Sequence, residues 1–123
     1  MDSASNVFEI ERQGDTVIVT PVTNLGEFAF HEVENDAATV LSLLDKGDVK
    51  NVVLDFHKTD HYGSTALGFF IKLLKRVRSM HGQMALCRVS AHEMDILRLL
   101  KLDQVWPICA SRDEALGVVS AAS

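Results

Sequence analysis

The sequence predicts a single α/β domain with a mixed, mostly parallel β-sheet and about four helices. Strand-like and helix-like segments alternate along the chain, which implies parallel strand pairs joined by helical crossovers. The first two strand-like segments are separated only by a short turn, which adds one antiparallel hairpin to the sheet. With 123 residues, of which 47% are hydrophobic, the chain has room for one core. We expect one domain over residues 1–123, with a structured core at about 7–119.

The predicted hairpin lies at the start of the chain. Residues 7–10 alternate weakly between apolar and polar, and residues 16–20 are rich in β-branched side chains, which favour strands. Gly14 and Asp15 between them are typical turn residues. Pro21 should end the second strand or place its end at an edge of the sheet, because proline cannot donate a hydrogen bond to a sheet.

A helix is expected next, with an apolar face that extends from Val33 to Leu44 and with Glu32, Glu34 and Asp36 in its first turns. Its apolar residues recur at the spacing of one helical face, and acidic residues fill its first turns, where they suit the positive end of the helix dipole. Gly47 is the expected stop. The apolar positions are Val33, Ala37, Val40, Leu41 and Leu44.

The middle of the chain predicts a central strand, a polar loop and a long helix. Residues 51–56 form a nearly continuous apolar run, as in strands buried on both faces. The loop covers residues 57–63, and the helix runs from about Ser64 to His81, with Gly82 as its expected C-cap.

The remaining elements repeat this alternation. Residues 84–89 predict another buried strand, and Ser90 with Glu93 forms a capping-box pattern for a helix through about Lys101. Residues 105–108 predict a short last strand, placed at an edge by Pro107.

A final short helix is predicted by a second capping box. Ser111 and Glu114 carry it, and the helix should continue through Leu116 and Val118.

Net charge and sequence motifs argue against several classes of function. The net charge of −5 argues against nucleic-acid binding, which usually needs a basic field. The first residues resemble no signal peptide, and no apolar run approaches the roughly 20 residues that span a bilayer. Cys87 and Cys109 fit no metal or redox spacing. We therefore expect a cytoplasmic protein with free thiols, no metal, no cofactor and no membrane contact.

Two hydroxyl residues, Ser64 and Thr65, open the long helix after the central strand. The first N–H groups of a helix lack internal partners and, with the helix dipole, favour an anion. A phosphoryl group on Ser64 would add about −1.5 to −2 charges there. The simpler interpretation of such a residue is an ordinary N-cap.

This region and three later segments resemble the STAS domain family, whose best-known small members are bacterial anti-sigma-factor antagonists. The resemblance covers roughly residues 7–119. The matching segments are Val52-Val53-Leu54-Asp55 followed after eight residues by Ser64-Thr65-Ala66-Leu67-Gly68, then Gly82–Cys87, Leu99–Ile108 and Asp113-Glu114-Ala115-Leu116.

The resemblance implies a binding module that is not an enzyme, and a phosphorylation switch at Ser64, with Thr65 as the second choice. In such proteins a serine-protein kinase that is also an anti-sigma factor modifies this serine. The unmodified form binds the kinase and frees the sigma factor, and a phosphatase resets the switch. The family commonly has aspartate before the serine, whereas this chain has Gly63. Gly63 favours the alternative of a phosphorylation-independent STAS scaffold in a signalling or transport complex.

The expected partner-binding surface combines the loop, the helix start and the wet face of the long helix. Basic residues on that face would suit an acidic partner, although an ordinary solvated face is the simpler interpretation. The predicted residues are Asp60, His61, Gly63, Ser64, Thr65, Gly68, Lys72, Lys75 and Arg76.

A small hydrolase or metal-dependent enzyme is the hypothesis from a different class. It would use His57, His61 and Asp60 of the loop. These residues supply no readable nucleophile–base pair and too few ligands for a closed metal site.

Overall fold

The structure, a computed structural model, describes residues 8–22, 30–47, 49–58 and 64–121, with the backbone alone for residues 30–37, 64–66 and 121. Its elements, in chain order, are β1 (Phe8–Gln13), β2 (Thr16–Pro21), α1 (Phe30–Asp45), β3 (Asn51–Asp55), α2 (Ser64–Ser79), β4 (Met84–Cys87), α3 (Ala91–Leu99), the 3-10 turn η2 (Leu102–Gln104), β5 (Ile108–Cys109) and α4 (Arg112–Ala121).

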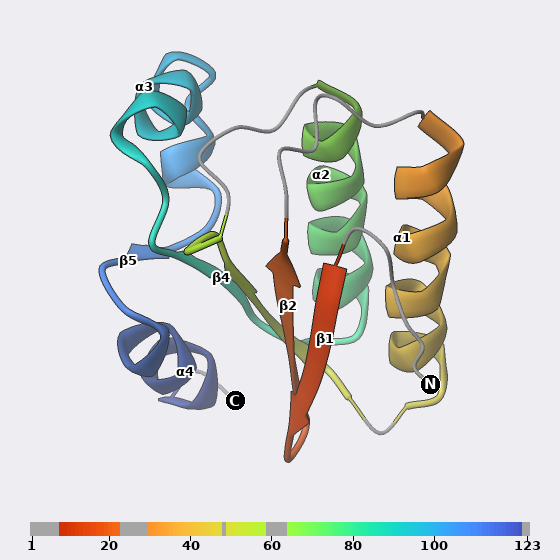
Figure 1. The fold of residues 1–123 in the computed structure, drawn as a ribbon. Helices are drawn as coiled ribbons and strands as arrows, with labels where there is room; N and C mark the ends of the chain where they lie inside the picture. The colour runs from red at the N-terminus through yellow and green to blue at the C-terminus, as the bar shows by residue number, and fades with distance from the viewer. Residues whose placement is uncertain (1–7, 23–29, 48, 59–63, 122–123) are drawn as a thin grey trace.

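The strands form one five-stranded sheet in the order β1-β2-β3-β4-β5. β1 and β2 are antiparallel, while each later neighbouring pair is parallel. The mixed sheet, the hairpin and the four α-helices predicted from the sequence are therefore confirmed. Figure 1 shows α1 and α2 side by side across one face of the sheet and α4 on the opposite face.

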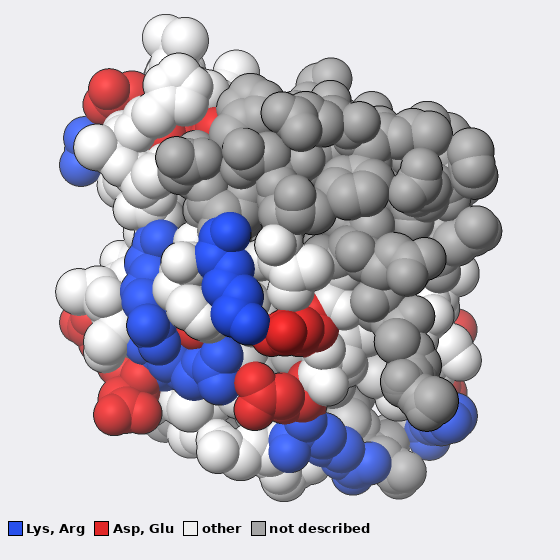
Figure 2. Space-filling view, viewed as in Figure 1, with Lys and Arg blue, Asp and Glu red and all other residues white. Residues whose placement is uncertain are grey.

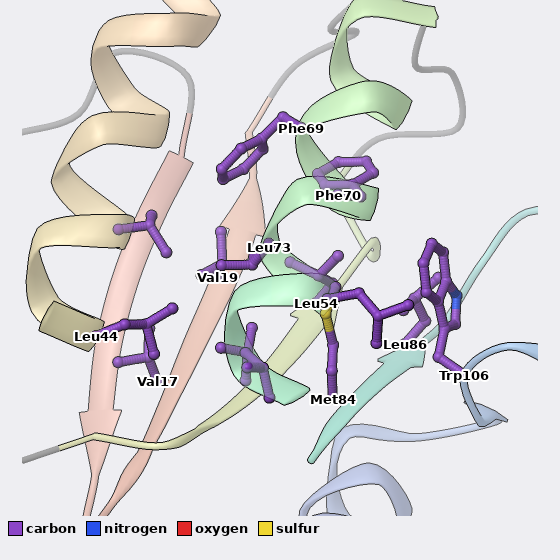
Figure 3. Packing of buried hydrophobic residues seen from close by; sticks show 14 of the residues in the cluster. Val17, Val19, Leu44, Leu54, Phe69, Phe70, Leu73, Met84, Leu86 and Trp106 are labelled. Carbon is purple, nitrogen blue, oxygen red and sulfur yellow. The ribbon is translucent and has the colours of Figure 1, made fainter. Parts of the chain in front are cut away.

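Alternating strand residues divide the core into two layers, because successive side chains of a strand point to opposite faces. The larger layer joins the sheet to α1, α2, α3 and Trp106, and the smaller layer joins it to α4. On β3, Val52 and Leu54 face the larger layer, whereas Val53 faces α4. Figure 3 shows the larger layer, with Phe69 and Phe70 of α2 above the strands and Trp106 beyond Leu86.

Aromatic contacts fix the first half of α2 over the sheet. The ring of Phe69 stacks on that of Phe8, with centroids 5.5 Å apart. Phe70 meets Phe56 edge-on, also at 5.5 Å. Because Phe56 directly follows β3, these contacts hold the start of α2 near the carboxyl end of the central strand.

Both predicted capping boxes are confirmed at their serines. Ser90 Oγ accepts from the Glu93 N–H at 3.2 Å, and Ser111 Oγ accepts from the Glu114 N–H at 3.1 Å. The Glu114 side chain reaches back to the N–H of Ala110 at 2.8 Å. The two serine bonds satisfy amide donors that a helix start leaves without internal partners.

The last strand departs from the prediction. β5 comprises Ile108 and Cys109 and not the predicted residues 105–108: the Val105 N–H donates back to the Leu102 carbonyl of η2 at 3.0 Å, and Trp106 is buried in the larger core layer. Pro107 contributes through its carbonyl, which accepts from the Leu86 N–H at 2.9 Å. The predicted edge position of this strand is confirmed.

The end of α2 corrects the role expected for Gly82. His81, with φ 62°, takes the left-handed position after the helix, and the N–H groups of His81 and Gly82 donate to Arg78 and Val77 carbonyls. This is a Schellman motif with histidine in the usual glycine position. Gly82 is required for another reason: a Cβ there would lie 1.7 Å from the carbonyl oxygen of Lys50.

Candidate functional site

The start of α2 carries the predicted modification site. The helix begins at Ser64, so Ser64 and Thr65 form its first turn, as the sequence predicted. α2 has no acidic side chain in its first turn to occupy the positive end of its dipole. The predicted partner residues Asp60, His61 and Gly63 lie outside the described residues.

The outer face of α2 carries the remaining predicted residues. Gly68, Lys72, Lys75 and Arg76 are all exposed. They lie on successive turns of one helix, and the Arg76 guanidinium donates to the Asp45 carboxylate at the end of α1. The basic side chains therefore gather along the boundary between α1 and α2.

A second polar centre, which the sequence did not predict, surrounds Asp55 at the end of β3. Asp55 is fully buried. Its Oδ1 accepts from the His57 N–H at 3.1 Å and lies 2.9 Å from His57 Nδ1. Its Oδ2 accepts from Arg112 Nε at 2.9 Å and lies 3.4 Å from Arg88 Nη2. Oδ1 is thus engaged by the nearby His57, and Oδ2 by two arginines from later parts of the chain.

Arg112 extends this Asp55 network to the N-terminal hairpin. Its Nη1 donates to Glu11 at 3.2 Å, and its Nη2 donates to Thr20 Oγ1 at 3.4 Å. One guanidinium at the start of α4 therefore joins β1, β2 and β3.

The network sets the protonation state of its members. Burial opposes ionisation of Asp55, but hydrogen bonds from Arg112 and His57 outweigh it, so the pKa of Asp55 lies below its ordinary value. The hydrogen bond to Asp55 raises the pKa of Arg112. Burial, reinforced by the negative charge of Asp55, raises the pKa of the neighbouring Cys87 thiol to about 12. At neutral pH, Asp55 and Arg112 are therefore both charged, and the neighbouring Cys87 thiol keeps its proton.

The charges around this network balance one another. Arg88 and Arg112 share Asp55, and Lys58, the residue after His57, forms a separate ion pair with Glu9 at 3.0 Å. Figure 2 shows Lys and Arg side chains gathered beside Asp and Glu on the face of the molecule that it presents. Because the cations have carboxylate partners, the arrangement favours a structural role over anion binding.

The described residues supply no set of ligands for the metal site of the hypothesised metal-dependent enzyme. Within the described ranges, no three His, Cys, Asp or Glu side chains are grouped so that they could hold a metal ion. His57, the described member of the proposed trio, directs Nδ1 to Asp55.

The sequence could have predicted that Asp55 needs partners, but not which residues supply them. If the carboxylate that ends an apolar strand is buried, it needs partners that compensate its charge. Arg112 lies 57 residues further along the chain, and no local pattern links it to Asp55.

The fold and the start of α2 define a class of protein: small mixed-sheet α/β domains with hydroxyl residues at the start of the helix that follows the central strand. The family model described as "STAS domain" matches residues 8–115. The chain belongs to the STAS domain family.

Sequence similarity to a named protein agrees with membership of the STAS domain family. BtrV of Bordetella bronchiseptica, provisionally assigned as an anti-sigma factor antagonist, is 27% identical over 78 residues, which span 63% of this chain and 66% of BtrV. The match therefore covers slightly less than two thirds of that relative's length.

Solved structures share the whole fold. A Thermotoga maritima protein with the same provisional assignment is 24% identical, with a TM-score of 0.82 over 94% of this chain and 97% of the other. Unphosphorylated SpoIIAA, an anti-sigma factor antagonist, is 20% identical, with a TM-score of 0.72 over 92% and 97%. Phosphorylated SpoIIAA from Bacillus is 21% identical, with a TM-score of 0.71 over 91% and 98%.

Among the described helices, none combines the length and apolar character required to cross a membrane.

Proposed function

We propose that this chain is an anti-sigma factor antagonist that changes partners through phosphorylation of Ser64. The observation that carries the proposal is the position of Ser64 as the first residue of α2, directly after the loop from the central strand of a STAS domain. The names of BtrV and SpoIIAA, and the phosphorylated form of SpoIIAA, support it.

In the proposed reaction, an anti-sigma factor with serine-kinase activity transfers the γ-phosphoryl group of ATP to Ser64 Oγ. ADP leaves and the hydroxyl proton is released. The product carries about −1.5 to −2 additional charges at the amino end of α2, where backbone amides and the helix dipole tolerate an anion. The fold is retained while the charge of the binding surface changes.

The proposed binding surface has two parts. One is the loop and helix start, comprising Asp60, His61, Gly63, Ser64, Thr65 and Gly68. The other is the basic face of α2, comprising Lys72, Lys75 and Arg76. The unmodified surface binds the anti-sigma factor and releases its sigma factor, the phosphorylated surface does not, and a phosphatase restores binding.

Phosphosite mass spectrometry tests the proposal. The chain is incubated with ATP and the serine kinase of anti-sigma type from the same organism, and Ser64→Ala and Thr65→Ala variants serve as matched controls. Incorporation that is lost in Ser64→Ala and kept in Thr65→Ala is expected. Modification at Thr65 alone would assign the phosphorylation site to Thr65 instead of Ser64. No modification together with no binding would refute the proposal.

A second candidate function, a phosphorylation-independent scaffold, is favoured by Gly63, since the family commonly has aspartate there. In that case the anti-sigma factor or another partner binds the wild type, Ser64→Ala and Ser64→Asp with equal affinity. A clear loss of affinity in Ser64→Asp alone supports the switch instead.

A further inference from the structure

An open groove of about 470 Å³ runs between the outer faces of α1 and α2. Leu41 and Asp45 of α1 line one side. The other side belongs to the second half of α2, and its lining residues are Lys72, Lys75, Arg76 and Ser79. The groove lies on the face of the molecule opposite α4, so it is separate from the Asp55 network.

The groove is basic in a chain whose net charge is −5. Asp45 neutralises Arg76. Lys72 and Lys75, by contrast, form no ion pair with any side chain in the described ranges. Ser79 donates its hydroxyl to the Arg76 carbonyl at 2.6 Å, so it contributes little to recognition. Two uncompensated cations therefore lie beside a half-buried leucine.

The groove also lies at a distance from Ser64. Lys72 is eight residues along α2 from Ser64, which corresponds to about 12 Å at the helical rise of roughly 1.5 Å per residue. The Debye length at physiological salt is about 8 Å, so a charge at residue 64 is largely screened at this distance. Binding in the groove and chemistry at Ser64 should therefore be separable.

We propose that the groove is a docking site for an acidic segment of the anti-sigma factor, which places at least two carboxylates against Lys72 and Lys75 and an apolar side chain over Leu41. The inference rests on the proposed function and adds the chemistry of the partner's contact. Charge complementarity of this kind mainly steers encounter and selects the partner. The groove would thus hold the kinase while Ser64 receives the phosphoryl group.

Steady-state kinetics of Ser64 phosphorylation test the inference. The groove variant is Lys72→Glu with Lys75→Glu, and the control is Arg98→Glu with Lys101→Glu, which makes the same change in net charge at exposed residues of α3 and the turn after it. Far-UV circular dichroism and fluorescence of Trp106, the single tryptophan, verify folding of both variants.

A docking role raises KM for the groove variant about tenfold and leaves kcat unchanged, because the variant residues lie away from the reacting hydroxyl. The control should retain the wild-type KM. An unchanged KM in the groove variant, or an equal rise in the control, would overturn the inference and remove the basic face of α2 from the proposed binding surface, while the phosphorylation switch at Ser64 would stand.

A second arm separates this inference from the phosphorylation switch. If the wild type binds the anti-sigma factor without being phosphorylated, the inference is tested by binding alone. The dissociation constants of the groove and control variants are then compared with that of the wild type. A tenfold loss confined to the groove variant supports it, and equal constants overturn it. If no anti-sigma factor binds the wild type, the proposed function and the docking inference both fail.

Discussion

Arg112 Nε, at the start of α4, donates a 2.9 Å hydrogen bond to Oδ2 of Asp55, the last residue of β3. Asp55 is completely shielded from solvent, and Arg112 is about three-quarters buried, with 24% of its side chain exposed. The same guanidinium contacts Glu11 and Thr20 of the hairpin. This ion pair therefore fastens the last helix to the strands at the carboxyl edge of the sheet.

Replacing Asp55 by asparagine should destabilise the fold by about 3 kcal/mol, because the largely buried Arg112 would lose its shielded counter-charge and keep only the ion pair with the exposed Glu11. Urea unfolding monitored by Trp106 fluorescence measures this loss. The control is Glu9→Gln, which weakens the exposed pair with Lys58 and should cost at most about 1 kcal/mol. A similar small cost for both variants would contradict the structural role assigned to Asp55.

The stability that Asp55 provides should also depend on pH. Its pKa in the folded chain lies below the ordinary value of 3.8, so the carboxylate stabilises the fold above that pH. This contribution is lost as the pH falls through the folded pKa, when the carboxyl becomes protonated. The stability difference between wild type and Asp55→Asn should therefore be constant near neutrality and shrink below about pH 4. A difference that grows on acidification would be inconsistent with this sign.

Alanine at position 82 should destabilise the fold by about 3 kcal/mol, because the added Cβ would overlap the Lys50 carbonyl and move the backbone before β3. Thermal unfolding of Gly82→Ala measures this cost. Gly117→Ala is the matched control: position 117 lies in α4, and a Cβ there meets no atom within 4 Å. The control should be stabilised by about 0.5–1 kcal/mol. Equal effects at the two positions would refute the close approach.

Glycine in place of His81 should stabilise the protein by about 0.5–1 kcal/mol. His81 has a φ of 62°, a conformation that costs energy for residues with a Cβ but not for glycine. His81→Ala, which keeps the Cβ, should remain close to wild type. The measurement is the urea midpoint of the three chains, and a loss of stability in His81→Gly would show that its imidazole matters more than its backbone.

The two cysteines should resist modification in the folded protein. Cys87 is fully buried with a pKa of about 12, and Cys109 is nearly buried with a raised pKa. Thiolate is the reactive form, so labelling with a disulfide reagent at pH 8 should be slow and should accelerate sharply in denaturant. Cys109→Ser isolates Cys87 for this assay. Rapid stoichiometric labelling of the folded variant would contradict the burial of Cys87.

Local patterns in the sequence were sufficient for most of the architecture. The hairpin, the central apolar strand and the helix beginning at Ser64 each follow from patterns within about 20 residues, such as β-branched runs, turn residues and helical periodicity. The capping boxes at Ser90 and Ser111 identified two helix starts to the residue. Element ends were less predictable, since β5 depends on how Trp106 packs into the core.

The sequence by itself determined an α/β chain, its family resemblance and the hydroxyl pair that opens α2, because these depend on residue type and spacing along the chain. Only the tertiary structure decided that Arg112 and Asp55 form a buried pair, and that α1 and α2 create a basic groove. Both features join side chains from elements distant in sequence. Their partners are chosen by the order of the strands and the packing of helices, which no local pattern specifies.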